Sequence, residues 1–204
     1  MHRTIGKLCL LLVLGSLLGI PALAEDAETQ GAGGPDMEAM MAAMEAAMKP
    51  GEHHEFLARM AGEWTFTNTM WMDPSQPPVT SDGTSTKTMI LGGRYLEDET
   101  HGEAMGKPFD GYGVTGYDNT GGEFVGTWID SMTTSIAVAK GERDGDTLTM
   151  HGEYVDPMSK QTMKVRAVTR VVNKNYHVFE YFMTMPGAPE FKSMVIEYRR
   201  KGAM

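Results

Sequence analysis

The chain has 204 residues, of which 41% are hydrophobic, 8% aromatic and 22% charged. This composition is close to that of an average globular protein, so it excludes a disordered or fibrous chain and predicts one compact domain. The formal net charge is −9. Binding to a nucleic-acid backbone needs Lys and Arg gathered on one face, whereas the basic residues here are scattered, so nucleic acid is excluded as a partner.

The first 24 residues have the pattern of a secretory signal peptide. A short basic region with Arg3 and Lys7 precedes an apolar run over residues 8–18, and residues 21–24 (Pro-Ala-Leu-Ala) end in an Ala-x-Ala cleavage site. The apolar run is too short for a bilayer-spanning helix, which needs about 20 residues. We therefore expect cleavage after Ala24, no membrane span, and a periplasmic or secreted protein.

The only cysteine, Cys9, lies inside this apolar run rather than just after it, which argues against a lipoprotein anchor. Cleavage would remove Cys9 together with Arg3 and Lys7, so the mature chain would have no thiol and a net charge of −11. A chain without thiols suits an oxidising compartment. It also excludes cysteine nucleophiles, zinc fingers and iron–sulfur ligation.

Two short N-terminal segments are predicted before the main domain. Residues 25–36 are acidic and nearly free of large apolar groups, so we expect a flexible leader. Residues 37–49 predict a helix with one methionine face, formed by Met37, Met40, Met41, Met44 and Met48. We expect this Met-rich helix to dock on the barrel or on another protein chain. The alternative is copper or another metal in an envelope protein, since thioethers suit Cu(I). A second short helix is predicted over residues 52–60.

From Gly62 onward the hydrophobic period changes from helical to twofold. The apolar residues Trp64, Phe66, Met70 and Met72 alternate with polar ones, mainly threonines, which predicts a half-buried strand. Turn-forming pairs such as Asp144-Gly145 and Pro186-Gly187 separate the later strands. Nine further strands are predicted near residues 79–91, 93–101, 109–118, 123–130, 134–142, 146–155, 161–172, 175–185 and 190–200.

Many short strands without intervening helices predict an all-β fold, either a sandwich or a barrel. An antiparallel up-and-down meander most simply removes its edges by closing on itself. We therefore expect a barrel of about ten strands over residues 50–201, preceded by one or two short helices. Thr, Lys, Arg and Glu at alternate strand positions argue against an outer-membrane barrel, whose outer band is apolar.

Six motifs in order resemble a bacterial family, domain-of-unknown-function family fifteen seventy-nine. They are PGEHHEFLARMAGEWTF (50–66), MWMDP (70–74), MILGGRYLED (89–98), GKPFDGYGVTGYDN (106–119), FVGTWIDSM (124–132) and EFKSMVIEYRRK (190–201). The resemblance implies a lipocalin-like antiparallel barrel in an exported protein. It implies no activity and no catalytic residues, and the Met-rich helix lies outside it.

An aromatic set would face the interior if strand parity holds: Trp64, Phe66, Tyr95, Trp128, Tyr181 and Tyr198. A small barrel is either filled by such side chains or encloses one small ligand, and both alternatives stay open. Glu97 and His101 share a strand face with Tyr95, whereas Leu96, Asp98 and Thr100 share the opposite face, so parity alone does not decide which face points inward. The ligand-binding candidates for a small hydrophobic or amphipathic molecule are Trp64, Phe66, Tyr95, Glu97, His101, Trp128 and Tyr181.

The residue pattern gives little support for a metal site or for catalysis. Adjacent His53 and His54 point apart on a helix, and His101, His151 and His177 come from different strands. A haem or metal site on His177 is the sharper alternative to an ordinary core or surface histidine. The sequence has no G-x-S-x-G elbow, Walker loop, H-E-x-x-H or dinucleotide fingerprint, so we assign no catalytic residue and no metal ligand, and the cofactor stays unknown. An enzyme of unknown reaction on the barrel remains an alternative.

Overall fold

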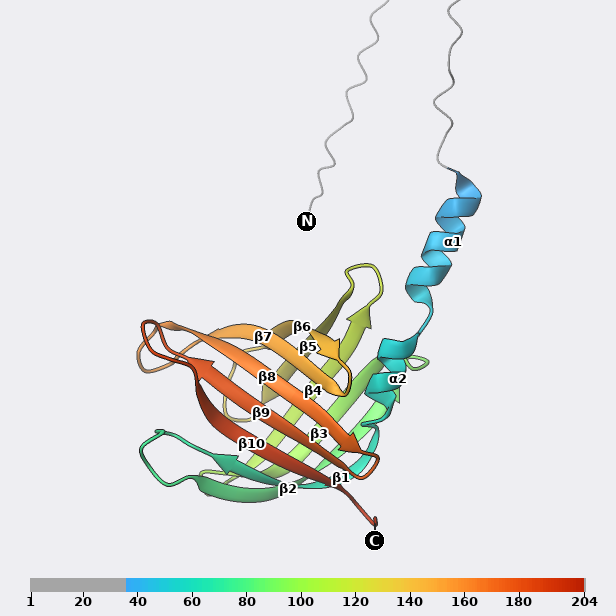
Figure 1. Cartoon of the computed structure of the whole chain (residues 1–204). Helices are drawn as coiled ribbons and strands as arrows, with labels where there is room; N and C mark the ends of the chain where they lie inside the picture. Colours follow the sequence, from blue (N-terminus) through green and yellow to red (C-terminus); the bar gives the residue numbers. More distant parts are fainter. Residues whose placement is uncertain (1–35, 204) are drawn as a thin grey trace, which may run out of the picture. The chain divides into compact units, whose positions relative to one another are not determined.

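The structure, a computed structural model, describes residues 36–203 (Figure 1). The predicted signal peptide and the acidic leader up to residue 35 lie outside the described residues. Residues 36–203 contain no helix that is both long and apolar enough to cross a membrane.

Ten antiparallel strands form a closed barrel in which each strand pairs with its neighbours in the sequence and β1 pairs with β10. This confirms the predicted up-and-down barrel. The strands are β1 (Gly62–Met70), β2 (Val79–Ile90), β3 (Tyr95–Ala104), β4 (Lys107–Asp118), β5 (Glu123–Asp130), β6 (Ala137–Asp144), β7 (Thr147–Val155), β8 (Thr162–Asn173), β9 (Tyr176–Thr184) and β10 (Phe191–Arg200).

Some strand ends differ from the expected ones because side chains cap the turns. Strand β6 begins at Ala137 rather than near residue 134. Before it, the carboxylate of Asp130 accepts hydrogen bonds from the backbone N–H groups of Met132 and Thr133, at 2.9 and 3.0 Å. Such a side-chain turn competes with the strand ladder. At the end of β1, Met72 lies beyond the strand and is exposed.

Helix α2 (Glu52–Ala58) lies at one end of the barrel, where the connections β2–β3, β4–β5, β6–β7 and β8–β9 also lie (Figure 1). Burial of apolar side chains fixes it there. Phe56 and Leu57 of α2, and Met60 just after it, belong to one buried cluster together with Leu96, Phe124, Leu148, Met150 and Val171. We call this the α2 end, and the opposite end of the barrel the mouth.

Arg200, the last residue of β10, fastens the chain after α2 to the barrel. Its guanidinium donates hydrogen bonds to the carbonyl oxygens of Ala61 at 2.8 Å and Arg59 at 3.2 Å, and lies 4.2 Å from the centre of the Trp64 ring. These bonds occupy carbonyl groups that a short helix leaves unpaired at its C-terminus. The α2 end is therefore closed by packing and by hydrogen bonds.

Helix α1 (Met37–Met48) has the predicted bounds to within one residue but buries none of its side chains. All five methionines of the predicted face are 43–64% exposed. Its C-terminal backbone contacts the barrel: Asn119 donates to the carbonyl oxygens of Ala46, Ala47 and Lys49, and Arg94 to that of Met48. Within residues 36–203, the methionine face therefore does not dock on the barrel.

Candidate functional site: the barrel interior

Burial alternates along the strands and decides which face points inward. On β3, Leu96 and Thr100 are buried and Asp98 contacts Ser85 and Lys87, so this face lines the interior. The opposite face is outside.

Three of the candidate ligand-binding residues therefore lie on the outer wall. Tyr95 is exposed, and Glu97 accepts a hydrogen bond from the hydroxyl of Tyr112, which raises the pKa of that tyrosine. His101 lies 2.7 Å from the Asp110 carboxylate, with both side chains more than 60% exposed. Outer residues cannot contact a ligand inside the barrel, so Tyr95, Glu97 and His101 do not belong to an interior site.

The other four candidates face the interior but at different depths. Trp64 and Phe66 are buried and pack with Tyr198 in a second cluster. Trp128 and Tyr181 lie nearer the mouth and keep partial exposure. The structure thus places four of the five aromatic ligand-binding candidates on the inner face, with Tyr95 on the outer face, and the polar residues of the interior differ from the predicted ones.

A group of four polar residues lies on the interior wall next to the α2-end cluster; we call it the polar floor. It consists of Ser85, Lys87, Asp98 and Thr100. The carboxylate of Asp98 accepts hydrogen bonds from Ser85 at 2.6 Å, from Thr100 at 3.1 Å and from the Lys87 ammonium. The Lys87 and Asp98 side chains are only 8% and 18% exposed. Burial alone would raise the pKa of Asp98, but Lys87 and the two hydroxyls hold it below its usual value.

His177 lies beside the polar floor and is 1% exposed. Its ring stacks on Tyr198 and meets the edge of Trp64, with centroid distances of 4.4 and 4.3 Å. Neither ring nitrogen has a hydrogen-bond partner among the described residues. Burial, and then the positive charge of Lys87, lowers the pKa of His177 to about 3, so the imidazole is neutral. A neutral imidazole carries one donor and one acceptor.

The half of the interior toward the mouth is apolar and partly open to solvent; we call it the mouth half. In a filled barrel, inward side chains would be buried like those of the α2 end. Here the inward residues of several strands keep intermediate exposure instead: Asn68, Trp128, Tyr154, Val165, Phe179, Tyr181, Met183, Met194 and Ile196. Aromatic and methionine side chains dominate this set, as they do in sites for apolar ligands.

Glycines let two aromatic rings lie flat against the wall of the mouth half. A Cβ at Gly111 would come within 2.3 Å of the Trp128 ring, and one at Gly83 within 2.3 Å of the Phe66 ring. The rings therefore occupy the space that side chains would take on β4 and β2. Indole Nε1 of Trp128 donates to Asp130 at 3.1 Å, which fixes the ring on the wall.

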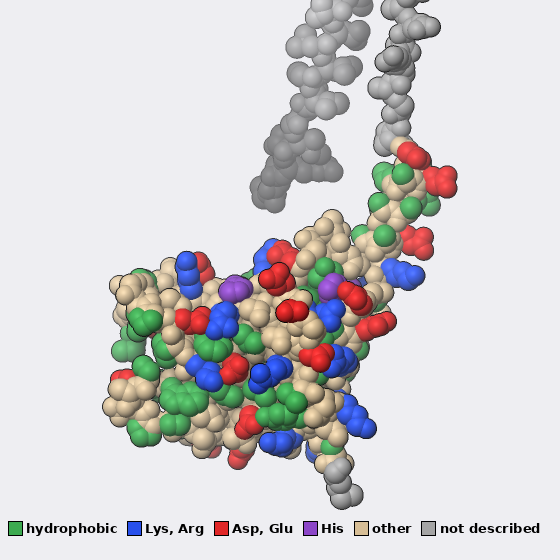
Figure 2. All heavy atoms as spheres, in the orientation of Figure 1, with side chains coloured by type: hydrophobic (Ala, Val, Ile, Leu, Met, Phe, Trp, Pro, Cys, Tyr) green, Lys and Arg blue, Asp and Glu red, His purple; other side chains and the backbone are tan. Residues whose placement is uncertain are grey.

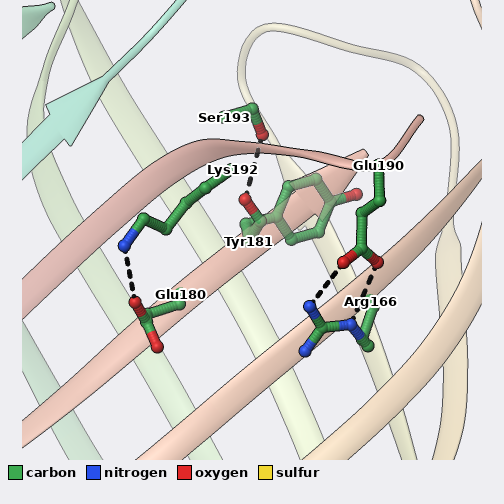
Figure 3. Close-up of polar contacts among 6 residues, drawn as sticks. All are labelled: Arg166, Glu180, Tyr181, Glu190, Lys192 and Ser193. Carbon is green, nitrogen blue, oxygen red and sulfur yellow. Dashed lines mark hydrogen bonds and ion pairs between the residues drawn. The ribbon is translucent and has the colours of Figure 1, made fainter. Parts of the chain in front are cut away.

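Tyr181 is positioned by a bulge in β10, as Figure 3 shows. The register of β10 against β9 shifts between Lys192 and Met194, and the hydroxyl of the extra residue, Ser193, donates to the Tyr181 carbonyl at 3.2 Å. On the neighbouring wall, Arg166 forms two hydrogen bonds with Glu190, at 3.0 and 2.6 Å, which anchor the β9–β10 connection. Burial raises the pKa of Tyr181 to about 12, so its hydroxyl stays protonated.

The outer wall carries charged side chains over the face drawn in Figure 2 and has two hollows. Basic and acidic side chains are intermingled over the face shown in Figure 2, without a patch of one sign. Two hollows of about 240 and 300 Å³ lie on the wall, lined in part by outward residues such as Thr65 and Glu153. Within residues 36–203, no three His, Cys, Asp or Glu side chains gather as a metal site would require.

The polar residues of the interior were missed by the sequence reasoning because Glu97 and Asp98 are neighbours on opposite faces. The sequence of β2 contains a signal that identifies the inward acidic residue. Lys87 lies two residues from Ser85 and from Met89 on the same strand face, so one inward lysine among small and apolar residues requires an inward acid opposite it. Its antiparallel partner on β3 is Asp98.

Comparison with known proteins places the chain in a family. The family described as "Protein of unknown function (DUF1579)" matches residues 49–200. The chain belongs to this family. No curated protein matches it in sequence.

Two solved structures share the barrel architecture. Rv2717c from M. tuberculosis is 14% identical, with a TM-score of 0.52, and the match covers 75% of this chain and 99% of that one. The S-type phycobiliprotein lyase CPES from Guillardia theta is 11% identical, with a TM-score of 0.53, and the match covers 79% and 98%. At these identities the likeness shows the fold alone.

Proposed function

We propose that this protein binds a small apolar or amphipathic molecule in the mouth half of its barrel. The observation that carries this proposal is the difference in burial between the two halves of one interior. Toward α2, eight side chains form a buried cluster, whereas toward the mouth Phe179, Tyr181 and Met194 stay partly exposed. Met163, at the mouth end of β8, is the exception, with 5% exposure. Covering such a surface with an apolar ligand removes it from water, at about 25 cal/mol per Å².

The expected export of the chain fits a role as an extracytoplasmic binding protein, and we propose this location as well. An enzymatic role gains no support from the interior. The hydrogen-bonded His–carboxylate pair of His101 and Asp110 lies on the outer face. His177, the interior histidine, has no hydrogen bond to a carboxylate.

Native mass spectrometry of the protein purified from its own host tests the proposal directly. We expect a copurified small molecule that is released on denaturation. In a second measurement, the fluorescent probe 1-anilinonaphthalene-8-sulfonate is titrated against the wild type and the variant Tyr181→Ala. We expect weaker probe binding in the variant. The outer-wall variant Tyr112→Phe serves as the matched control. Absence of both a copurified ligand and interior probe binding would refute the proposal.

The methionines of α1 favour a second candidate function. Their exposure leaves the thioethers of Met40, Met44 and Met48 accessible, and soft sulfur ligands suit Cu(I). A competition titration with bathocuproine disulfonate tests this. Replacing these three methionines with leucine should abolish Cu(I) binding if α1 holds the metal. Unchanged affinity in the variant would remove this candidate.

A further inference from the structure

The polar floor and His177 hold hydrogen-bonding capacity that the chain itself does not use. Within the part of the chain that the structure describes, neither ring nitrogen of His177 has a hydrogen-bond partner. The Lys87 ammonium has three N–H donors and one hydrogen-bond acceptor, Asp98, besides its position 4.6 Å from the centre of the Tyr198 ring. Buried donors and acceptors are nearly always satisfied, so capacity left over in the interior, next to the partly exposed residues of the mouth half, indicates a polar partner there.

The charges of this region are already balanced. Lys87 and Asp98 neutralise each other, and His177 is neutral. Arg200, another cation near His177, already donates hydrogen bonds to the backbone carbonyl groups of Lys174, Ala61 and Arg59. A ligand with a carboxylate or an ammonium end would add one uncompensated charge at a site with little water, which is costly.

Resting on the ligand-binding function proposed above, we infer that the ligand carries an uncharged hydroxyl group at the end that meets the polar floor. A hydroxyl donates one hydrogen bond and accepts others, which matches the unused capacity of an imidazole and an ammonium. Asp98 is the floor residue most open to the lumen. The apolar part of the ligand would lie along Phe179, Ile196 and Tyr181 in the mouth half.

Three probes that share one alkyl chain but differ in their polar end group distinguish this inference from the ligand-binding function on which it rests. We would measure the affinities of 1-decanol, decanoate and decylammonium by quenching of tryptophan fluorescence at pH 7.5. We expect 1-decanol to bind at least about tenfold more tightly than either ion, a difference of about 1.4 kcal/mol. Equal binding of the three probes overturns the inference and leaves the ligand-binding function intact. Binding of none overturns both.

Variants of the polar floor test whether its charge balance causes the preference for 1-decanol. Asp98→Asn leaves Lys87 as the only floor charge, and should shift the preference from 1-decanol to decanoate. Lys87→Met leaves Asp98 unpaired, and should shift it to decylammonium. Where a single variant does not fold, the double variant Lys87→Met with Asp98→Asn has a neutral floor and should keep the preference for 1-decanol. A double variant that prefers decanoate overturns the charge-balance argument.

His177 is tested with His177→Phe, which keeps an aromatic ring between Trp64 and Tyr198. We expect this variant to bind 1-decanol several-fold more weakly relative to decanoate than the wild type does. Tyr112→Phe, on the outer wall, is the control and should leave all three affinities unchanged. If His177→Phe leaves the ratio unchanged, the imidazole serves packing alone and its part in the inference is refuted.

Discussion

The imidazole of His177 lies nearly parallel to the phenol of Tyr198, with 4.4 Å between ring centroids and 12° between ring planes. These residues face each other on β9 and β10, and Tyr198 pairs with Phe66 on β1, two positions from the pair of Trp64 and Arg200. The stack excludes water from the titratable ring of His177, which has no hydrogen-bond partner among residues 36–203. Burial of the imidazole is tolerated only while the ring is neutral, because a charged ring would be buried without a partner.

We predict that His177 makes the protein acid-sensitive. The unfolded chain binds a proton near pH 6.5, whereas the folded protein binds one only near pH 3. Stability is therefore full above pH 6.5 and falls as the pH decreases from 6.5 to 3. By pH 5 this group alone should cost about 2 kcal/mol relative to pH 7. Urea denaturation of the wild type and His177→Phe at both pH values measures this loss of stability. Identical pH dependence of the two proteins would contradict the prediction.

At pH 7 we expect His177→Phe to be more stable than the wild type, by about 1 kcal/mol, because it removes two buried polar atoms that lack partners. Thermal unfolding at neutral pH measures this. A large loss of stability would show that a bound water or ligand satisfies these atoms in solution.

The buried pair of Lys87 and Asp98 should contribute to stability in a non-additive way. Lys87→Met leaves a carboxylate that is 18% exposed without its cation, and should cost about 3 kcal/mol. The double variant Lys87→Met with Asp98→Asn should recover most of this loss, since no unpaired charge remains. A double-mutant cycle measured by urea denaturation checks the coupling; additive losses would count against it.

The wall glycines should be intolerant of side chains. In Gly111→Ala the new Cβ would meet Trp128 at 2.3 Å, so the ring must move or the variant loses about 1–3 kcal/mol. Tryptophan emission and thermal unfolding report the two outcomes. Gly51→Ser is a suitable control, because a Cβ at Gly51 has no neighbour within 4 Å and serine is a preferred residue before a helix. Wild-type behaviour of Gly111→Ala would contradict the ring placement.

Removing the core contact of α2 should weaken the whole barrel. Leu57 is fully buried in the α2-end cluster, so Leu57→Ala should cost roughly 2–5 kcal/mol. The exposed neighbour substitution Glu55→Ala should change stability by less than about 0.5 kcal/mol. Equal small effects in the two variants would show that α2 is not part of the cooperative unit.

The strands and their order could be predicted from the sequence because alternation and turn residues are local signals. Trp64 and Phe66 share a face with a period of two whatever the partner strand is. The face of β3 could not be decided in this way. Glu97 and Asp98 are both acidic, and only the position of Lys87 across the ladder selects Asp98 as the inward residue.

The environment of α1 could not be predicted for a related reason. Its spacing of methionines specifies a helix with one apolar face, and the helix is present. What covers that face depends on surfaces elsewhere, and the barrel donates hydrogen bonds to carbonyl groups around Met48 while the five methionines stay exposed. A periodic pattern indicates that a face is apolar, not where it is buried.

The closure of the barrel by β1 and β10 also constrains how the chain can fold. The ladder that completes the barrel runs from the pair Trp64 and Arg200 to the pair Met70 and Met194, so it joins residues 136 to 124 positions apart. Contacts of this length form late and slow folding. Until β10 (Phe191–Arg200) has been synthesised, β1 and β9 each present an unpaired edge, which invites association between nascent chains. The export proposed above fits this order of events, because a chain that still lacks β10 cannot close its barrel.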